Sequence, residues 1–156
     1  MKAVLPFATV MLSILGIADA GYITYEKFTG VIPKCIPGFE CGKVLTSPWS
    51  SIGPVPLSLL GLIYYFCVLL IASLVILEVD IHKLLPTLPS FLTKLTTFDF
   101  LWLLTIFGFA FSLYLIFIMG VVIQGWCTYC LVSAATCTLL FASTSLNKFL
   151  NREKTS

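Results

Sequence analysis

Charged residues are scarce in this chain. Only 10% of its 156 residues are Asp, Glu, Lys or Arg, whereas soluble proteins carry about 25%. There is a single histidine, and 59% of the residues are hydrophobic. So few polar side chains cannot cover a surface that faces water, which excludes an ordinary soluble domain. Because a lipid bilayer accepts the excess apolar surface, the composition predicts an integral membrane protein.

Four apolar stretches are long enough to cross a hydrocarbon core about 30 Å thick, which takes roughly 20 residues. They run approximately over Ala3–Tyr25, Val55–Leu77, Phe100–Ile123 and Cys127–Phe149. None alternates as a β-strand does, and only helices and closed barrels span a membrane. We therefore expect an all-α integral membrane protein of one domain, residues 1–156. The domain is a four-transmembrane-helix bundle with loops over residues 26–54 and 79–99.

The first stretch also resembles a secretory signal peptide. Lys2 precedes it, and Ala18-Asp19-Ala20 has the form of a cleavage site. We favour a membrane helix because the apolar residues continue through Tyr25.

Basic residues near the helix ends favour an orientation with both termini in the cytoplasm. With four spans, the two termini and the 79–99 loop share one side. That side carries Lys2, Lys83, Lys94, Lys148, Arg152 and Lys154, whereas the 26–54 loop carries Lys27, Lys34 and Lys43. The first loop and residues 125–130, GWCTYC, are therefore expected together on the outer face.

Two cysteine pairs fall on that face. Cys127-Thr-Tyr-Cys130 has the spacing used for thiol–disulfide exchange, and it lies where the fourth helix is expected to begin. Helix N–H groups and the helix dipole stabilise a thiolate there. Cys35 and Cys41 bracket a Pro-Gly turn. A bridge between them would contribute only about 2 kcal/mol to stability, which suits exchange better than a plain structural disulfide, the alternative.

The four cysteines together could instead bind zinc. The C-x5-C spacing is wide for structural zinc, however, and His82 falls on the opposite face. We therefore expect no metal. Cys67 and Cys137 lie within expected spans and are interpreted as small apolar side chains.

Several motifs, in order, resemble the vitamin K epoxide reductase family in its prokaryotic form, over nearly the whole chain. They are Cys35-x5-Cys41, Cys41-Gly-Lys-Val-Leu-Thr-Ser47, Ile52-Gly-Pro-Val-Pro-Leu-Ser-Leu-Leu-Gly61 and Trp126-Cys127-Thr-Tyr-Cys130. DsbB-type oxidases, which do similar chemistry in four helices, carry the two pairs in the reverse order.

The resemblance implies a helix bundle around a quinone, with an outer-face loop that closes over it as a lid. It also implies an electron relay from a thioredoxin-fold (DsbA-like) carrier. Cys35 would meet that carrier, Cys41 would exchange with Cys127, and Cys130 would face the quinone. Ser47 aligns with the family's loop Ser/Thr and would support the quinone site or the loop; a plain turn hydroxyl is the alternative.

Two departures bear on the substrate. Ala134 stands where eukaryotic members have a tyrosine near the quinone, and the loop asparagine of those members has no clear counterpart. A simple quinone such as ubiquinone or menaquinone is therefore favoured over vitamin K epoxide. Since this sequence ends at Asn151-Arg-Glu-Lys-Thr-Ser156, the carrier is expected to be a separate chain. We expect no nucleic-acid partner.

Asp19 is the only ionisable residue well inside an expected span. Such residues usually face the bundle interior or a cavity. We hypothesise that Asp19 gives a proton or a hydrogen bond to the reduced quinone; a neutral packing residue is the alternative. Tyr22 and Tyr25 are interpreted as anchors at the membrane interface.

The sequence thus predicts a thiol:quinone oxidoreductase that reoxidises its carrier and supports disulfide formation. The expected location is a prokaryotic inner membrane, or the endoplasmic reticulum in a eukaryote. Two alternatives stay open. One is a quinone or vitamin K epoxide reductase whose product is the reduced quinone. The other is a non-enzymatic membrane protein with a metal-binding or structural cysteine cluster.

Overall fold

The structure, a computed structural model, describes residues 4–77 and 97–152. Within these residues four helices are long and apolar enough to cross a membrane, which confirms the expected spans. They are α1 (Val4–Thr29), α3 (Leu57–Ile76), α5 (Thr97–Phe117) and α6 (Thr128–Arg152). A π-helical segment, η3 (Ile118–Ile123), continues α5.

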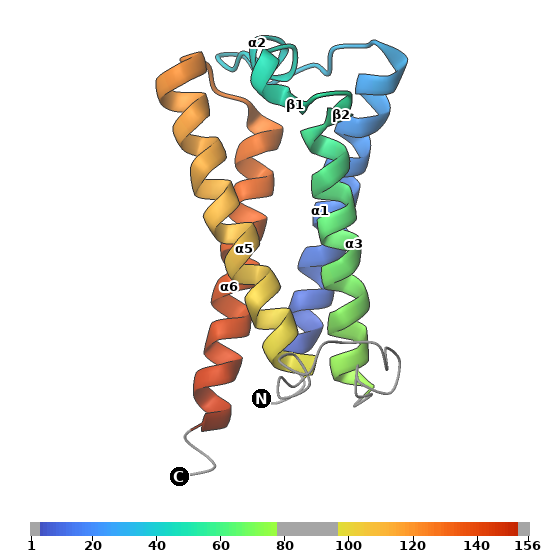
Figure 1. The fold of residues 1–156 in the computed structure, drawn as a ribbon, viewed down its shortest axis with the longest axis vertical. Coiled ribbons are helices and arrows are strands. Elements are labelled where there is room, and N and C mark those ends of the chain that lie inside the picture. Colours follow the sequence, from blue (N-terminus) through green and yellow to red (C-terminus); the bar gives the residue numbers. More distant parts are fainter. Residues whose placement is uncertain (1–3, 78–96, 153–156) are drawn as a thin grey trace.

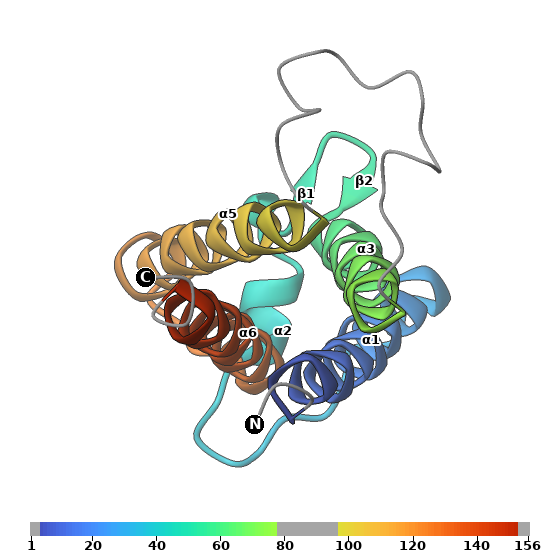
Figure 2. The ribbon, with the colours of Figure 1, turned by 90° about the horizontal axis from the view of Figure 1, so that it is seen from below.

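The four long helices form a closed ring (Figure 2). Each packs against two others, so that α1 contacts α3 and α6, and α5 likewise contacts α3 and α6. The start of α1 and the end of α6 lie at one end of the bundle, and the connection from α1 to α3 crosses the other end (Figure 1). The segment between α5 and α6, in which GWCTYC begins, lies at the same end as that connection.

Small residues allow the helices to approach closely in the middle of the bundle. The buried ring of Tyr65 on α3 lies against Gly16 of α1, where a Cβ atom would overlap it. On the opposite side, Thr105 of α5 and Thr144 of α6 share a buried hydrogen bond of 2.9 Å. Lipid offers little hydrophobic driving force between helices, so close packing and interhelical hydrogen bonds stabilise such bundles.

The connection from α1 to α3 contains only short elements. It runs through a five-residue helix, α2 (Cys41–Leu45), a 3₁₀ turn, η1 (Pro48–Ser50), and a hairpin of β1 (Ser51–Ile52) and β2 (Val55–Pro56). The two strands are antiparallel, with Ser51 opposite Pro56 and Ile52 opposite Val55. Gly53 turns the hairpin at φ +61°, in the left-handed region that glycine adopts without strain.

Several expected boundaries need correction. The first helix continues to Thr29, so Glu26 and Lys27 belong to α1 and not to the loop. The second spanning helix begins two residues late, at Leu57, because Val55 and Pro56 pair in the hairpin. The third begins earlier than expected, at Thr97, and the fourth begins at Thr128. Most of the expected 79–99 loop lies outside the described residues.

Candidate functional site

The loop cysteines form a disulfide. Cys35 and Cys41 are joined, with their Cα atoms 6.0 Å apart. Cys35 lies half-buried in the extended segment, whereas Cys41 begins α2 and is almost completely buried. Cys35 is therefore the more exposed cysteine of the bridge, and Cys41 the more buried one.

Cys127 occupies the N-cap position of α6 and immediately precedes the spanning helix. Its carbonyl accepts a hydrogen bond of 3.1 Å from the Leu131 N–H, as an N-cap carbonyl does. Hydrogen bonds from the Cys130 thiol and from the backbone N–H groups of Cys130 and Tyr129 lower the pKa of Cys127 to about 7. Burial and the charge of Asp19 oppose this effect. Cys127 is thus the thiol of this pair that ionises near neutral pH.

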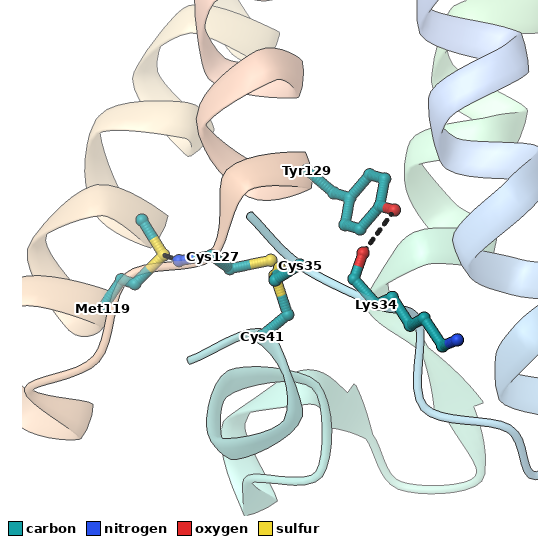
Figure 3. The surroundings of a disulfide bond; sticks show 6 residues. All are labelled: Lys34, Cys35, Cys41, Met119, Cys127 and Tyr129. Atoms are coloured by element: carbon teal, nitrogen blue, oxygen red, sulfur yellow. Dashed lines mark hydrogen bonds between the residues drawn. A yellow bond between two sulfur atoms is a disulfide. The ribbon is translucent and has the colours of Figure 1, made fainter. Parts of the chain in front are cut away.

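The two cysteine pairs meet in one buried cluster. Cys41, Val44, Met119 and Cys127 form it, and Cys35 and Cys130 pack against it. Figure 3 shows the Cys127 side chain pointing toward the Cys35–Cys41 bridge. On the far side of Cys127, its backbone N–H donates to Met119 Sδ at 3.4 Å. A thiolate beside a disulfide is the starting arrangement for thiol–disulfide exchange.

Three hydrogen bonds fasten the loop to the segment that carries the second pair. They join the Glu40 N–H to Trp126 O at 2.9 Å, Lys43 Nζ to Gln124 O at 3.0 Å, and the Tyr129 hydroxyl to Lys34 O at 3.1 Å. These bonds flank both cysteine pairs, so they hold the pairs against each other.

A lysine on α1 also forms hydrogen bonds to the loop. Lys27 Nζ donates to Leu45 O, at the end of α2, at 2.8 Å and to Ser50 Oγ at 2.9 Å. The α1 helix therefore supports the loop from the opposite side of the bundle.

Ser47 uses its hydroxyl on the loop itself. Its Oγ donates to Val44 O at 2.7 Å. This bond to the residue three positions earlier is typical of a plain turn hydroxyl, the alternative interpretation, and a role of Ser47 at a quinone site stays a prediction.

Asp19 lies about three turns below the end of α1, which extends to Thr29. Its carboxylate is close enough to Cys127 and Cys130 to act on both electrostatically. One oxygen, Oδ2, is buried and has no hydrogen-bond partner among the described residues. A buried oxygen without a hydrogen-bond partner costs free energy, so Asp19 is a buried polar group beside the C-x-x-C whose hydrogen bonding the described residues do not satisfy.

Two cavities flank the loop, and no cysteine lines either of them. One of about 320 Å³ lies between α1 and the loop and is lined by Glu26, Lys27 and Ile32, among others. The other, of about 310 Å³, is lined largely by apolar side chains, including Trp49, Phe111 and Tyr114.

The remaining cysteines lie in the helix packing. Cys137 is buried, and its sulfur is 3.2 Å from the Tyr65 hydroxyl; Cys67 is half-buried on α3. Across residues 4–77 and 97–152, no group of three or more His, Cys, Asp or Glu side chains is placed to hold a metal ion.

Met119, Glu26, Lys27 and the hydroxyl of Tyr129 were not expected at this end of the bundle. Met119 contacts Cys127, 8 residues away, and Lys27 contacts Leu45, 18 residues away, and no local pattern marks either pair. Glu26 could have been found from its spacing, because Asp19, Tyr22 and Glu26 recur at helical intervals on one face of α1.

The fold and the site together define a class of small membrane bundles in which a loop disulfide and a C-x-x-C meet at one end. The model of the Vitamin K epoxide reductase family matches residues 7–145, and the chain belongs to this family. It is also similar to the thiol-disulfide oxidoreductase LTO1 of Arabidopsis thaliana, at 32% identity over 125 residues. That match covers 79% of this chain but 31% of LTO1, so the chain spans about a third of its relative's length.

Proposed function

We propose that the protein is a membrane thiol:quinone oxidoreductase that reoxidises a thioredoxin-fold carrier. In this proposal electrons pass through Cys35–Cys41 to Cys127–Cys130 and then to a quinone. The observation that carries it is the single buried cluster in which Cys127, with a pKa of about 7, lies beside Cys41 of the loop bridge. The family match and the name of the Arabidopsis relative support the same chemistry.

The exposure of the two loop cysteines suggests the order of the thiol steps. A carrier thiolate attacks Cys35, the more exposed cysteine of the bridge, and Cys41 leaves as a thiolate. The carrier's second thiolate then attacks the mixed disulfide, so that the carrier leaves oxidised and the loop pair is left as two thiols. Two electrons have entered the protein.

The second exchange lies inside the cluster. Cys41 attacks Cys127 of the oxidised C-x-x-C, a Cys41–Cys127 disulfide forms, and Cys130 is released. Cys35 then attacks Cys41, which restores the loop bridge and leaves Cys127 and Cys130 reduced. A closed loop bridge beside two free thiols, the pairing in this structure, corresponds to the end of that step.

Reduction of a quinone takes two electrons and two protons. Cys127 and Cys130 supply the electron pair when they form their disulfide. Cys130 lies in the first turn of α6 and interacts electrostatically with the Asp19 carboxylate, so we assign the acceptor to the vicinity of these two side chains. Asp19, when protonated, donates a hydrogen bond to the acceptor's oxygen.

Two observations bear on the alternatives. Two of the four outer sulfurs are joined in a disulfide, which weighs against a four-cysteine metal site. Ala134 on α6 is buried and has no hydroxyl to offer, so a simple quinone is favoured over a quinone epoxide. We further propose that both termini face the cytoplasm and that the cysteine end faces outward.

Trapping the Cys41–Cys127 disulfide tests the relay. In the double variant Cys35→Ser/Cys130→Ser neither outer thiol can resolve that bond, so mild oxidation should join Cys41 to Cys127 nearly completely, as read from disulfide-linked peptides. The matched control, Cys35→Ser/Cys67→Ser, keeps Cys130 and should instead form Cys127–Cys130. Failure of the first variant to form the cross-link, in protein that is folded, would contradict the proposal.

A further inference from the structure

Three polar side chains follow one face of α1 from the loop down to the C-x-x-C. They are Glu26, Tyr22 and Asp19, at intervals of four and three residues, which places them one above the next. The chemistry proposed above involves only Asp19. Glu26 and Tyr22 lie between Asp19 and the loop end of the helix.

Contacts link these groups to each other and to α6. The Tyr22 hydroxyl interacts electrostatically with the Glu26 carboxylate and with the Tyr129 hydroxyl. The rings of Tyr22 and Tyr129 are also in contact, with centroids 5.5 Å apart. Since Tyr129 lies inside the C-x-x-C, the row on α1 ends beside the reactive thiols.

Two carboxylate oxygens in this row are buried without a partner. Glu26 Oε2 and Asp19 Oδ2 have no hydrogen bond among the described residues. The nearest cation in sequence, Lys27, donates instead to Leu45 O and Ser50 Oγ. A buried carboxylate oxygen without a hydrogen bond destabilises a fold. Because one lies at each end of the row, we infer that these oxygens serve a function that requires them to be free to accept a proton.

The outer end of the row opens on a cavity. Glu26 lines the space of about 320 Å³ between α1 and the loop, together with Lys27, Gly30 and Thr46. Glu26 therefore faces this cavity on one side and Tyr22 on the other.

We propose that Glu26 and Tyr22 carry a proton from the loop cavity to Asp19, from which it reaches the quinone. This inference rests on the proposed quinone reduction.

The proton balance of that reaction requires such a supply. Oxidation of a Cys127 thiolate and a Cys130 thiol to a disulfide releases two electrons but only one proton, whereas reduction of the quinone takes two of each. The quinone therefore needs one further proton, equal in number to the one that Cys127 lost when it ionised. In this proposal the row on α1 supplies that proton from the outer side.

The other titratable groups that face the row are few. From α6 they are Cys127, Cys130 and Tyr129. From α3 the neighbouring group is Tyr65, whose hydroxyl is engaged with Ser133 and Cys137.

Two variants test the relay in the full chain. Tyr22→Phe keeps the ring against Tyr129 and removes only the hydroxyl, and Glu26→Gln removes the proton-carrying group. The reduced protein is mixed with a soluble quinone, and quinone loss is followed across pH and buffer concentration. Tyr25→Phe, on the exposed side of α1, is the matched control.

We expect both variants to reduce the quinone about 10-fold or more slowly, within the range for lost proton transfer. Their rates should rise with the concentration of buffer acid, whereas the wild-type and Tyr25→Phe rates should not. A small weak acid such as formic acid should partly restore Glu26→Gln. Carrier oxidation by the loop pair, which does not use the row, should stay unchanged.

The outcomes separate the two proposals. Unchanged rates and buffer dependence in both variants, with a wild type that reduces the quinone, overturn the relay alone. A wild type that reduces no quinone overturns the proposed function and the relay with it.

Discussion

Removal of the Lys27 ammonium should open the loop over Cys127. Lys27 Nζ makes two hydrogen bonds to the loop, at 2.8 Å to Leu45 O and at 2.9 Å to Ser50 Oγ. In Lys27→Met the length of the side chain is kept, but both bonds are lost and the carbonyl at the end of α2 loses a donor. Cys127, which is 0% exposed under the closed loop, becomes reachable whenever the loop lifts.

The expected increase in loop opening follows from the free energy of the two hydrogen bonds that are lost. A hydrogen bond from a charged donor contributes about 1.5–3 kcal/mol when it is shielded from water. Lys27 is half-buried and water competes for the ammonium, so we take about 2 kcal/mol for the pair. Because about 1.4 kcal/mol is a factor of ten, the open population should rise about 30-fold.

Thiol labelling measures that population. When opening is fast, the labelling rate of Cys127 under native conditions scales with the fraction of open loop. The rate in Lys27→Met should therefore rise about 30-fold, with Lys27→Arg between this variant and the wild type. Lys148→Met is the control, because Lys148 pairs with Asp99 at the opposite end of the bundle. Equal labelling of Cys127 in Lys27→Met and Lys148→Met would refute the reasoning.

Two further predictions concern the thiol and the helix packing. In Cys130→Ala the side-chain hydrogen bond that contributes most to the low pKa of Cys127 is lost, so the thiolate absorbance of Cys127 should titrate above pH 7; an unchanged titration would contradict the assigned cause. In Gly16→Ala the new Cβ overlaps the Tyr65 ring, which should lower the free energy of unfolding by about 1–3 kcal/mol. Gly21→Ala meets only Leu62 Cδ1 at 3.7 Å and should be tolerated, as unfolding in a denaturing detergent would show.

Much of the fold could be predicted because a bilayer restricts how a chain can be folded across it. Runs of apolar residues fix the number of spans, and their order brings the first loop and residues 125–130 to one end. The predicted ends of the helices were less accurate. An apolar run shows which residues lie in the hydrocarbon core, whereas a helix can continue beyond the core. The helix α1 continues through Glu26 and Lys27, which are too polar to be counted in a span.

The cysteine arrangement was predictable from motifs, but its supports were not. The position of Cys127 at the start of α6 follows from the sequence, and the structure places it at the N-cap. The contacts of Met119 with Cys127 and of Lys27 with Leu45 join residues whose separation in sequence carries no pattern. Only the packed fold shows these contacts.

The central claim is that electrons pass from a carrier through both cysteine pairs to a quinone. Stopped-flow absorbance of the purified protein with a reduced thioredoxin-fold protein and a soluble quinone tests it directly. We expect quinone reduction in the wild type and none in Cys127→Ser or Cys130→Ser. A quinone that stays oxidised with the wild type, even when a strong dithiol replaces the carrier, would contradict it.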